Sequence, residues 1–107
     1  MICRTWNGWT TPENADAYEH VVTTEVLPGI AAMNIAGFRG AHVLRRDRDD
    51  EVEFTTLIWF DSIDNVRDFM GEDYSVAHVP PAARAVLSRY DERAGHHEVR
   101  MTPNELA

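Results

Sequence analysis

The stretch Val52-Glu53-Phe54-Thr55-Thr56-Leu57-Ile58-Trp59-Phe60 is predicted to form a strand with apolar residues on both of its faces. Successive side chains of a strand point to opposite faces of the sheet. One face therefore carries Val52, Phe54, Ile58 and Phe60, and the other carries Leu57 and Trp59. A chain of 107 residues has enough helices to cover only one side of such a sheet. The second side needs another cover, for which a second copy of the chain and a bound apolar molecule are the simplest choices.

Length and composition indicate one globular domain. The chain is 44% hydrophobic and 26% charged. No apolar run approaches the roughly 20 residues that a membrane helix needs, so we expect no membrane association. Residues 1–10 lack the continuous apolar core of a secretory signal, which predicts a cytoplasmic location. Cys3 is the only cysteine, which excludes an internal disulfide and agrees with a reducing compartment.

The charge pattern argues against a nucleic-acid partner. The net charge is −8, and all ten basic residues are arginines. The densest arginine cluster, within residues 45–48, continues directly into the acidic run Asp49-Asp50-Glu51. Phosphate binding needs an uncompensated basic surface, which this pattern does not provide.

The first part of the chain is predicted to form a strand and then a helix. Residues 1–9 alternate as a strand. Its two faces carry Ile2 and Trp6 on one side, and Cys3, Thr5, Asn7 and Trp9 on the other. Thr11 and Pro12 mark a helix start, because threonine caps helices and proline suits the first helical position. This helix is expected to reach about Leu27 and to end or bend at Pro28-Gly29.

The next two strands are predicted to form an antiparallel hairpin. Residues 38–44 and 52–60 are joined by a turn through residues 48–50. In the first of these strands the alternation puts Phe38, Gly40, His42 and Leu44 on one face, and Ala41 and Val43 on the other.

Two helices and a strand are predicted to complete the domain. Asp61-Ser62 caps the first helix, whose apolar stripe consists of Ile63, Val66, Phe69 and Met70. Pro80-Pro81 ends that region, a short helix follows over residues 81–89, and a last strand lies near residues 96–101. Residues 102–107 form a tail that is frayed or exchanged with a partner.

This order of elements predicts a ferredoxin-like α+β fold with a four-stranded antiparallel sheet in a single domain, residues 1–101. Helices cover one face of the sheet. If the other face pairs with the same face of a second copy, two four-stranded sheets make a barrel-like homodimer.

Two short motifs resemble a known family. Ala36-Gly37-Phe38-Arg39-Gly40 is similar to that family's entry into its second strand. Trp59-Phe60-Asp61-Ser62, followed by Val66 and Phe69, is similar to its third strand and the helix after it. The family is the antibiotic biosynthesis monooxygenase superfamily of small dimeric α+β barrel proteins. It includes cofactor-independent quinone-forming monooxygenases and haem-degrading monooxygenases.

For the haem-degrading branch, the resemblance implies an asparagine on the first strand, a helix tryptophan and a haem-ligating histidine ten residues beyond it. Asn7 and His78 match two of these positions, but Asp68 stands where the tryptophan is expected. An acid at this position would face an apolar macrocycle and lose the packing of the indole.

For the quinone-forming branch, the resemblance implies tryptophan, asparagine, and arginine or histidine around an aromatic substrate whose anion reacts directly with oxygen. We therefore expect His78 as the base, Asn7 as an amide that orients oxygen, and Trp59 as a pocket wall. Phe69 and Tyr74 are expected to contact the substrate. No flavin or phosphate-loop fingerprint occurs, so the expected cofactor is none, with haem as the alternative.

Structural roles fit the same residues. His78 can instead meet backbone carbonyls at a helix end, Asn7 can satisfy a neighbouring backbone group, and Trp59 can belong to the core or to a dimer interface. In that case the protein is a non-catalytic ligand-binding dimer. His96-His97 does not predict a metal site, because adjacent strand residues face opposite ways.

Overall fold

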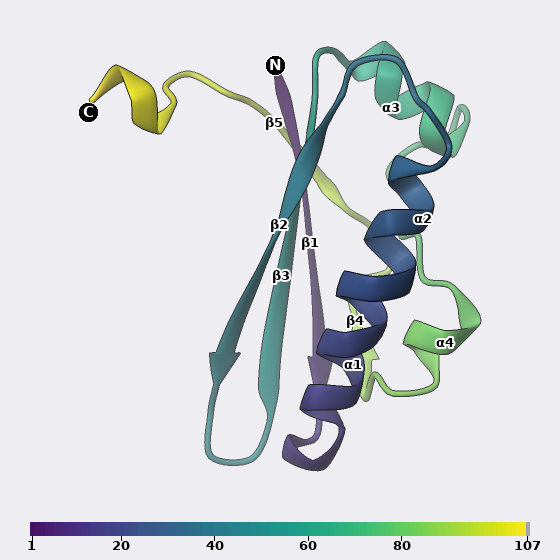
Figure 1. Ribbon diagram of the computed structural model, residues 1–107, viewed down its shortest axis with the longest axis vertical. Coiled ribbons are helices and arrows are strands. Elements are labelled where there is room, and N and C mark those ends of the chain that lie inside the picture. Colours follow the sequence, from purple (N-terminus) through teal and green to yellow (C-terminus); the bar gives the residue numbers. More distant parts are fainter. Residues whose placement is uncertain (107) are drawn as a thin grey trace.

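The computed structural model describes residues 1–106, which form a sheet with helices packed on one face (Figure 1). Its long strands are β1 (Ile2–Thr10), β2 (Phe38–Asp47) and β3 (Val52–Phe60), and its short strands are β4 (Arg89–Tyr90) and β5 (Gly95–Glu98). The helices are η1 (Pro12–Asn14), α1 (Ala15–Val21), η2 (Val22–Val26), α2 (Leu27–Ala31), α3 (Ile63–Met70), α4 (Pro81–Arg84) and η3 (Pro103–Glu105). No helix among these residues is long and apolar enough to span a membrane.

The sheet has the ferredoxin-like order β2-β3-β1-β4, with β5 also paired to β1. Its centre is the antiparallel pair of β1 and β3, which runs from Ile2 opposite Phe60 to Thr10 opposite Val52. The predicted α+β fold and the hairpin of β2 and β3 are confirmed. The strand predicted near residues 96–101 corresponds to β5, which ends earlier, at Glu98, and the short strand β4 was not predicted.

β4 and β5 are separate strands because the backbone between them forms its hydrogen bonds with another segment. Between β4 and β5 the chain leaves β1 and pairs with residues 75–77: Ala77 N–H donates to Glu92 O at 2.9 Å, and Ala94 N–H donates to Ser75 O at 2.7 Å. The helix predicted over residues 81–89 is also shorter, because Ser88 N–H turns toward the sheet and donates to Trp9 O at 2.8 Å.

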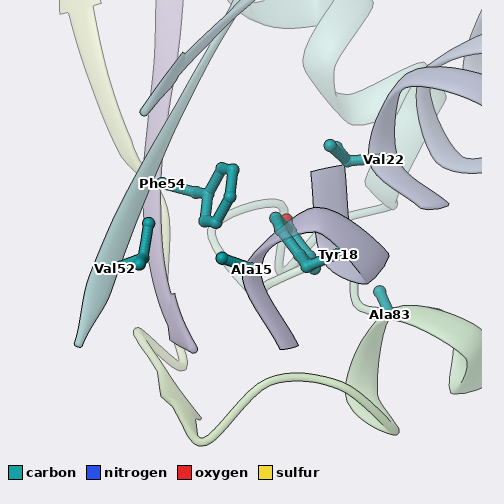
Figure 2. Close-up of a cluster of buried hydrophobic side chains, with 6 residues drawn as sticks. All are labelled: Ala15, Tyr18, Val22, Val52, Phe54 and Ala83. Atoms are coloured by element: carbon teal, nitrogen blue, oxygen red, sulfur yellow. The ribbon is translucent and has the colours of Figure 1, made fainter. Parts of the chain in front are cut away.

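The predicted alternation of β3 is confirmed by its burial. Val52, Phe54, Thr56, Ile58 and Phe60 are buried beneath the helices, while the residues between them are only half-buried. Figure 2 shows Phe54 and Val52 pointing from the strand toward the first helical segments. Tyr18 packs edge-on against Phe54, with ring centroids 4.8 Å apart. This cluster fixes α1 against the sheet.

The first helical region continues past Pro28-Gly29, so of the two predicted outcomes, an end or a bend, the end at that pair is wrong. It ends at Ala31, after the wide π-helical segment η2. Leu27 N–H donates to Val22 O, five residues earlier. Proline cannot donate to the regular pattern. The wide turn directly before Pro28 relieves this misfit and lets the helix pass the proline.

The predicted face of Phe38 is wrong, because β2 contains a bulge. The register shifts between Phe38 and Ala41, so Phe38 lies opposite Phe60 on the helix face, which Ala41 and Val43 share. His42 and Leu44 keep the opposite face. Gly40 has a φ of 99°, a conformation that other residues rarely adopt, and this makes the bulge possible.

The predicted cap of α3 is confirmed. Ser62 and Asn65 form a capping box, and the oxygen of the Asn65 amide accepts from Ser62 N–H at 3.0 Å. Gly37 packs directly against this amide, and Gly37 O accepts from Asp61 N–H at 2.9 Å. The start of β2 and the start of α3 therefore depend on each other.

We predict that Gly37→Ala destabilises the protein more than Gly40→Ala. Both glycines have positive φ, which costs an alanine about 1–2 kcal/mol. A Cβ at Gly37 would also collide with the Asn65 side chain, adding about 1–3 kcal/mol, whereas a Cβ at Gly40 meets open space. Urea unfolding of both variants measures the difference. Equal losses would contradict the packing of Gly37 against the cap.

Candidate functional site

A cavity lies between the helix face of the sheet and the first helical region. The space between its walls is about 480 Å³, a volume that includes open solvent at the mouth. Its walls are mostly apolar and consist of Arg4, Trp6, Tyr18, Val22, Val26, Leu27, Ile30, Thr56, Ile58, His78, Val79 and Ala83. Two of these residues, Val22 and Val26, lie at the ends of the π-helical segment η2. No carboxylate is among the lining residues.

Arg4 is the most deeply buried charge of the cavity. Strand alternation puts it on the helix face between Ile2 and Trp6, and only 3% of its surface is exposed. Nη1 donates to Tyr74 O at 2.5 Å and lies 3.1 Å from His96 Nε2, and Nη2 donates to Val76 O at 2.8 Å. Burial lowers the pKa of Arg4 to about 10, so it stays protonated at neutral pH.

Arg4 has no acidic partner in the part of the chain that the structure describes. It takes part in none of the ion pairs formed among residues 1–106. Its neighbours are two backbone carbonyls, an imidazole and the ring of Phe69, whose centroid lies 5.6 Å from the guanidinium carbon. The guanidinium therefore gives the cavity a positive charge in a protein whose net charge is −8.

His78 brings a neutral imidazole to the same cavity. Its ring packs edge-on against Phe69, with centroids 5.1 Å apart. Burial lowers the pKa of His78, and the positive charge of Arg4 lowers it further. At neutral pH the ring consequently has an unprotonated nitrogen that can accept a proton. Arg4 also holds the chain beside His78, because it binds the carbonyls of Tyr74 and Val76.

His96 is the second histidine of this region and lies opposite Arg4 on β5. Burial, with the charges of Arg4 and His97, lowers the pKa of His96 to about 4. A neutral His96 can accept from Arg4 through Nε2, which assigns its proton to Nδ1. His97 pairs with Cys3 and lies on the other face of the sheet, as alternation predicts.

The structure does not bring all of the predicted site residues together. His78 lines the cavity, but Asn7 and Trp59 lie on the sheet face that has no helices. Asn7 Nδ2 donates to Glu53 Oε2 at 2.7 Å, and Trp59 Nε1 donates to His42 Nδ1 at 3.0 Å. Within one protomer the sheet separates both side chains from the cavity.

Phe69 and Tyr74 lie behind the cavity wall. Phe69 stacks on Phe60, with centroids 6.1 Å apart, and supports the ring of His78. Tyr74 contributes its carbonyl to Arg4, while its ring packs against His96 with centroids 5.1 Å apart. Both residues position charged or titratable groups and are absent from the lining residues.

Three polar lining residues were missed by the sequence analysis: Arg4, Tyr18 and Thr56. The sequence carries a signal for Arg4, because its strand position lies between Ile2 and Trp6, two apolar residues of the same face. Burial raises the pKa of Tyr18 to about 12, so its hydroxyl remains protonated at neutral pH. Among the described residues, no group of three or more potential metal ligands converges.

We predict that Arg4→Met raises the pKa of both His78 and His96, because each loses a nearby positive charge. In the wild type, NMR titration should find His96 near pH 4 and His78 below its usual value of 6.5. Since both folded-state pKa values lie below the unfolded value, their contribution to stability is present above pH 6.5 and is lost as the pH falls toward 4. Arg84→Met, an exposed change in α4, is the control. Unchanged titration in Arg4→Met would contradict this electrostatic coupling.

The fold is shared with solved structures of two oxygenase-related proteins. One is described as a "putative antibiotic biosynthesis monooxygenase" from Bacillus cereus, with a TM-score of 0.65 and 14% identity over 94% of this chain and 92% of that chain. The other is SnoaB, a cofactor-independent oxygenase from Streptomyces nogalater, with a TM-score of 0.58 and 21% identity over 95% of this chain and 96% of that chain. No protein-family model and no curated protein matches the sequence. The chain therefore has the α+β fold of the antibiotic biosynthesis monooxygenases that its sequence resembles.

Proposed function

We propose that the protein is a cofactor-independent monooxygenase that acts on a small aromatic or polycyclic substrate in the cavity. The observation that carries this proposal is the meeting of a neutral histidine, His78, and a buried cation, Arg4, in an otherwise apolar space. A base beside a positive charge is suited to forming and holding a substrate anion. The description of SnoaB as a cofactor-independent oxygenase agrees with this chemistry.

The proposed reaction starts with a proton transfer to the free nitrogen of His78. The substrate anion then transfers electrons to O₂, and a peroxide forms at the same carbon. Loss of water from the peroxide leaves a carbonyl group. Overall, a CH₂ group and O₂ give C=O and H₂O, so the substrate supplies all four electrons and no external reductant is needed.

Arg4 and Tyr18 would support this step electrostatically. The charge of Arg4 lowers the energy of a neighbouring anion, and the burial of the guanidinium strengthens this interaction. The Tyr18 hydroxyl, whose pKa is about 12, is available as a donor to a developing oxyanion. These groups occupy the cavity in place of Asn7 and Trp59, whose proposed roles would require a route from the opposite sheet face.

Haem fits this cavity poorly. His78 offers a neutral nitrogen of the kind that ligates iron, but Asp68, at the position of the expected helix tryptophan, is exposed on α3 and provides no flanking ring. Phe69, the adjacent aromatic residue, is already packed between Phe60 and His78. We therefore include no haem in the proposed reaction and treat haem binding as an outcome of the test.

We also infer a homodimer formed through the uncovered sheet face. On this face, 49% of the surface of Leu44 is exposed to solvent, and Leu57 and Trp59 are half-exposed. In Figure 1 the chain after β5 runs away from the helices on this side of the sheet, toward η3. Leu106 in this tail is exposed by 78%, while Ala107 lies outside the described residues. A second copy would cover both the face and the tail.

We predict that His78→Ala slows the oxidation of an anthrone, a simple aromatic with an activated CH₂ group, by about 100-fold or more, the usual effect of losing a general base. Oxygen uptake and quinone absorbance measure the rate. His20→Ala, an exposed change on α1, should leave the rate unchanged.

Two outcomes would contradict the proposed function. Wild-type protein that does not exceed the uncatalysed rate would favour the ligand-binding dimer without catalysis. A Soret band that saturates at one haem per subunit and disappears in His78→Ala would instead favour the haem branch.

Light scattering at micromolar concentration should give twice the subunit mass of 12.2 kDa. Leu57→Arg should yield monomers, because it puts a charge in the centre of the apolar face. Asp68→Arg, an exposed change on the helix layer, should remain dimeric. A monomeric wild type would refute the inferred interface.

A further inference from the structure

The guanidinium of Arg4 is buried, charged and without a counter-ion in the described chain. We propose that the cavity binds a small apolar molecule that carries a carboxylate, and that the Nε and Nη2 groups of Arg4 hold this carboxylate. This inference rests on the proposed function, because it names the substrate class of the same cavity. Three observations support it: the donors that Arg4 leaves free, the way other arginines of the chain bind carboxylates, and the division of the cavity into polar and apolar parts.

The first observation is the set of unused donors. Arginine has five N–H groups. Those that have protein partners belong to Nη1, which contacts Tyr74 O and His96 Nε2, and to Nη2, which contacts Val76 O. Nε–H and one N–H of Nη2 have no partner among the described residues. Among residues 1–106, Thr10 Oγ1 is the only fully buried side-chain polar atom without a hydrogen-bond partner. Because Nε of Arg4 also lacks a partner but is not such an atom, it is accessible from outside the protein.

The second observation is that the same two nitrogens bind carboxylates elsewhere in the molecule. Arg39 holds Asp61 through Nε at 2.9 Å and Nη2 at 2.6 Å. Arg45 holds Asp47 through Nε at 2.7 Å and Nη2 at 3.2 Å. This side of the guanidinium matches the two oxygens of a carboxylate. In Arg4, Nε–H and one of the two N–H groups of Nη2 have no partner among the described residues, and the residue lines the cavity.

The third observation is the arrangement of the cavity. Arg4 provides the charge of the cavity and His78 its imidazole, while Val22, Val26 and Leu27 on the first helical region provide an apolar wall. A buried charge without a counter-ion is unfavourable, and a ligand carboxylate would offset that cost while the apolar wall contacts the body of the ligand. The absence of acidic lining residues leaves nothing to repel such an anion.

The test uses 2-naphthoate and its neutral counterpart of similar shape, 2-naphthamide, with binding measured by calorimetry. The wild type should bind the acid at least about tenfold more tightly than the amide. In Arg4→Met this preference should disappear. In Arg4→Lys it should be reduced, because lysine keeps the charge but cannot donate two parallel hydrogen bonds to a carboxylate. Arg39→Met, which removes an exposed arginine of the same binding geometry, should keep the full preference.

Arg4→Met can also loosen residues 74–76, whose carbonyls Arg4 binds. The ratio of the two affinities is informative even then, because such loosening weakens the binding of both ligands. Equal binding of acid and amide by the wild type would overturn the proposal, as would an unchanged preference in a folded Arg4→Met. Failure of the wild type to bind the acid would overturn it as well. If the variant does not fold, the wild-type ratio alone decides.

A third ligand, 2-naphthol, separates a carboxylate site from a phenolate site. Binding of naphthol as tightly as the acid, with the absorbance of the phenolate at pH 7, would overturn the assignment to a carboxylate. Oxygen uptake is measured separately. Preference for the acid without anthrone oxidation would refute the oxygenase and keep the carboxylate site, whereas oxidation without the preference would do the opposite.

Discussion

The antiparallel register of β1 and β3 determines which side chains of these two strands face the cavity. It aligns Arg4 with Ile58 and Trp6 with Thr56 beneath the helices, and it puts Asn7 with Thr55 on the other face. A slip of one residue would move all inward side chains of a strand outward. The edge strands and the helical layer are built onto this pair, so the chemical content of the cavity depends on a correct register.

Arg4 links parts of the chain that are far apart in sequence. Its side chain extends from β1 to the carbonyls of Tyr74 and Val76 and to His96 on β5. The same region contains the pairing of residues 75–77 with residues 92–94, which separates β4 from β5. A buried charge has thus been retained where an apolar residue would pack more simply, which is characteristic of functional positions.

Elements with strong local patterns were predictable from the sequence. The two-faced strand β3, the cap at Ser62 and the hairpin follow from alternation and capping rules, which are local. The π-helical passage through Pro28, the bulge after Phe38 and the separation of β4 from β5 depend on tertiary contacts. For the site, alternation already put Asn7 and Trp6 on opposite faces, but which face holds the cavity depends on where the helices pack. His78 was predicted from the resemblance to the family. Arg4 was not predicted, because its role depends on a burial that only the folded structure shows.

The alternation of β1 and β3 separates two sets of residues within the same strands. The inward set, including Arg4, Thr56 and Ile58, shapes the cavity, while the outward set, including Asn7, Leu57 and Trp59, shapes the uncovered face. A substitution in one set leaves the other in place. Evolution can therefore change ligand specificity and subunit association independently, and both properties can be engineered separately at adjacent positions of a single strand.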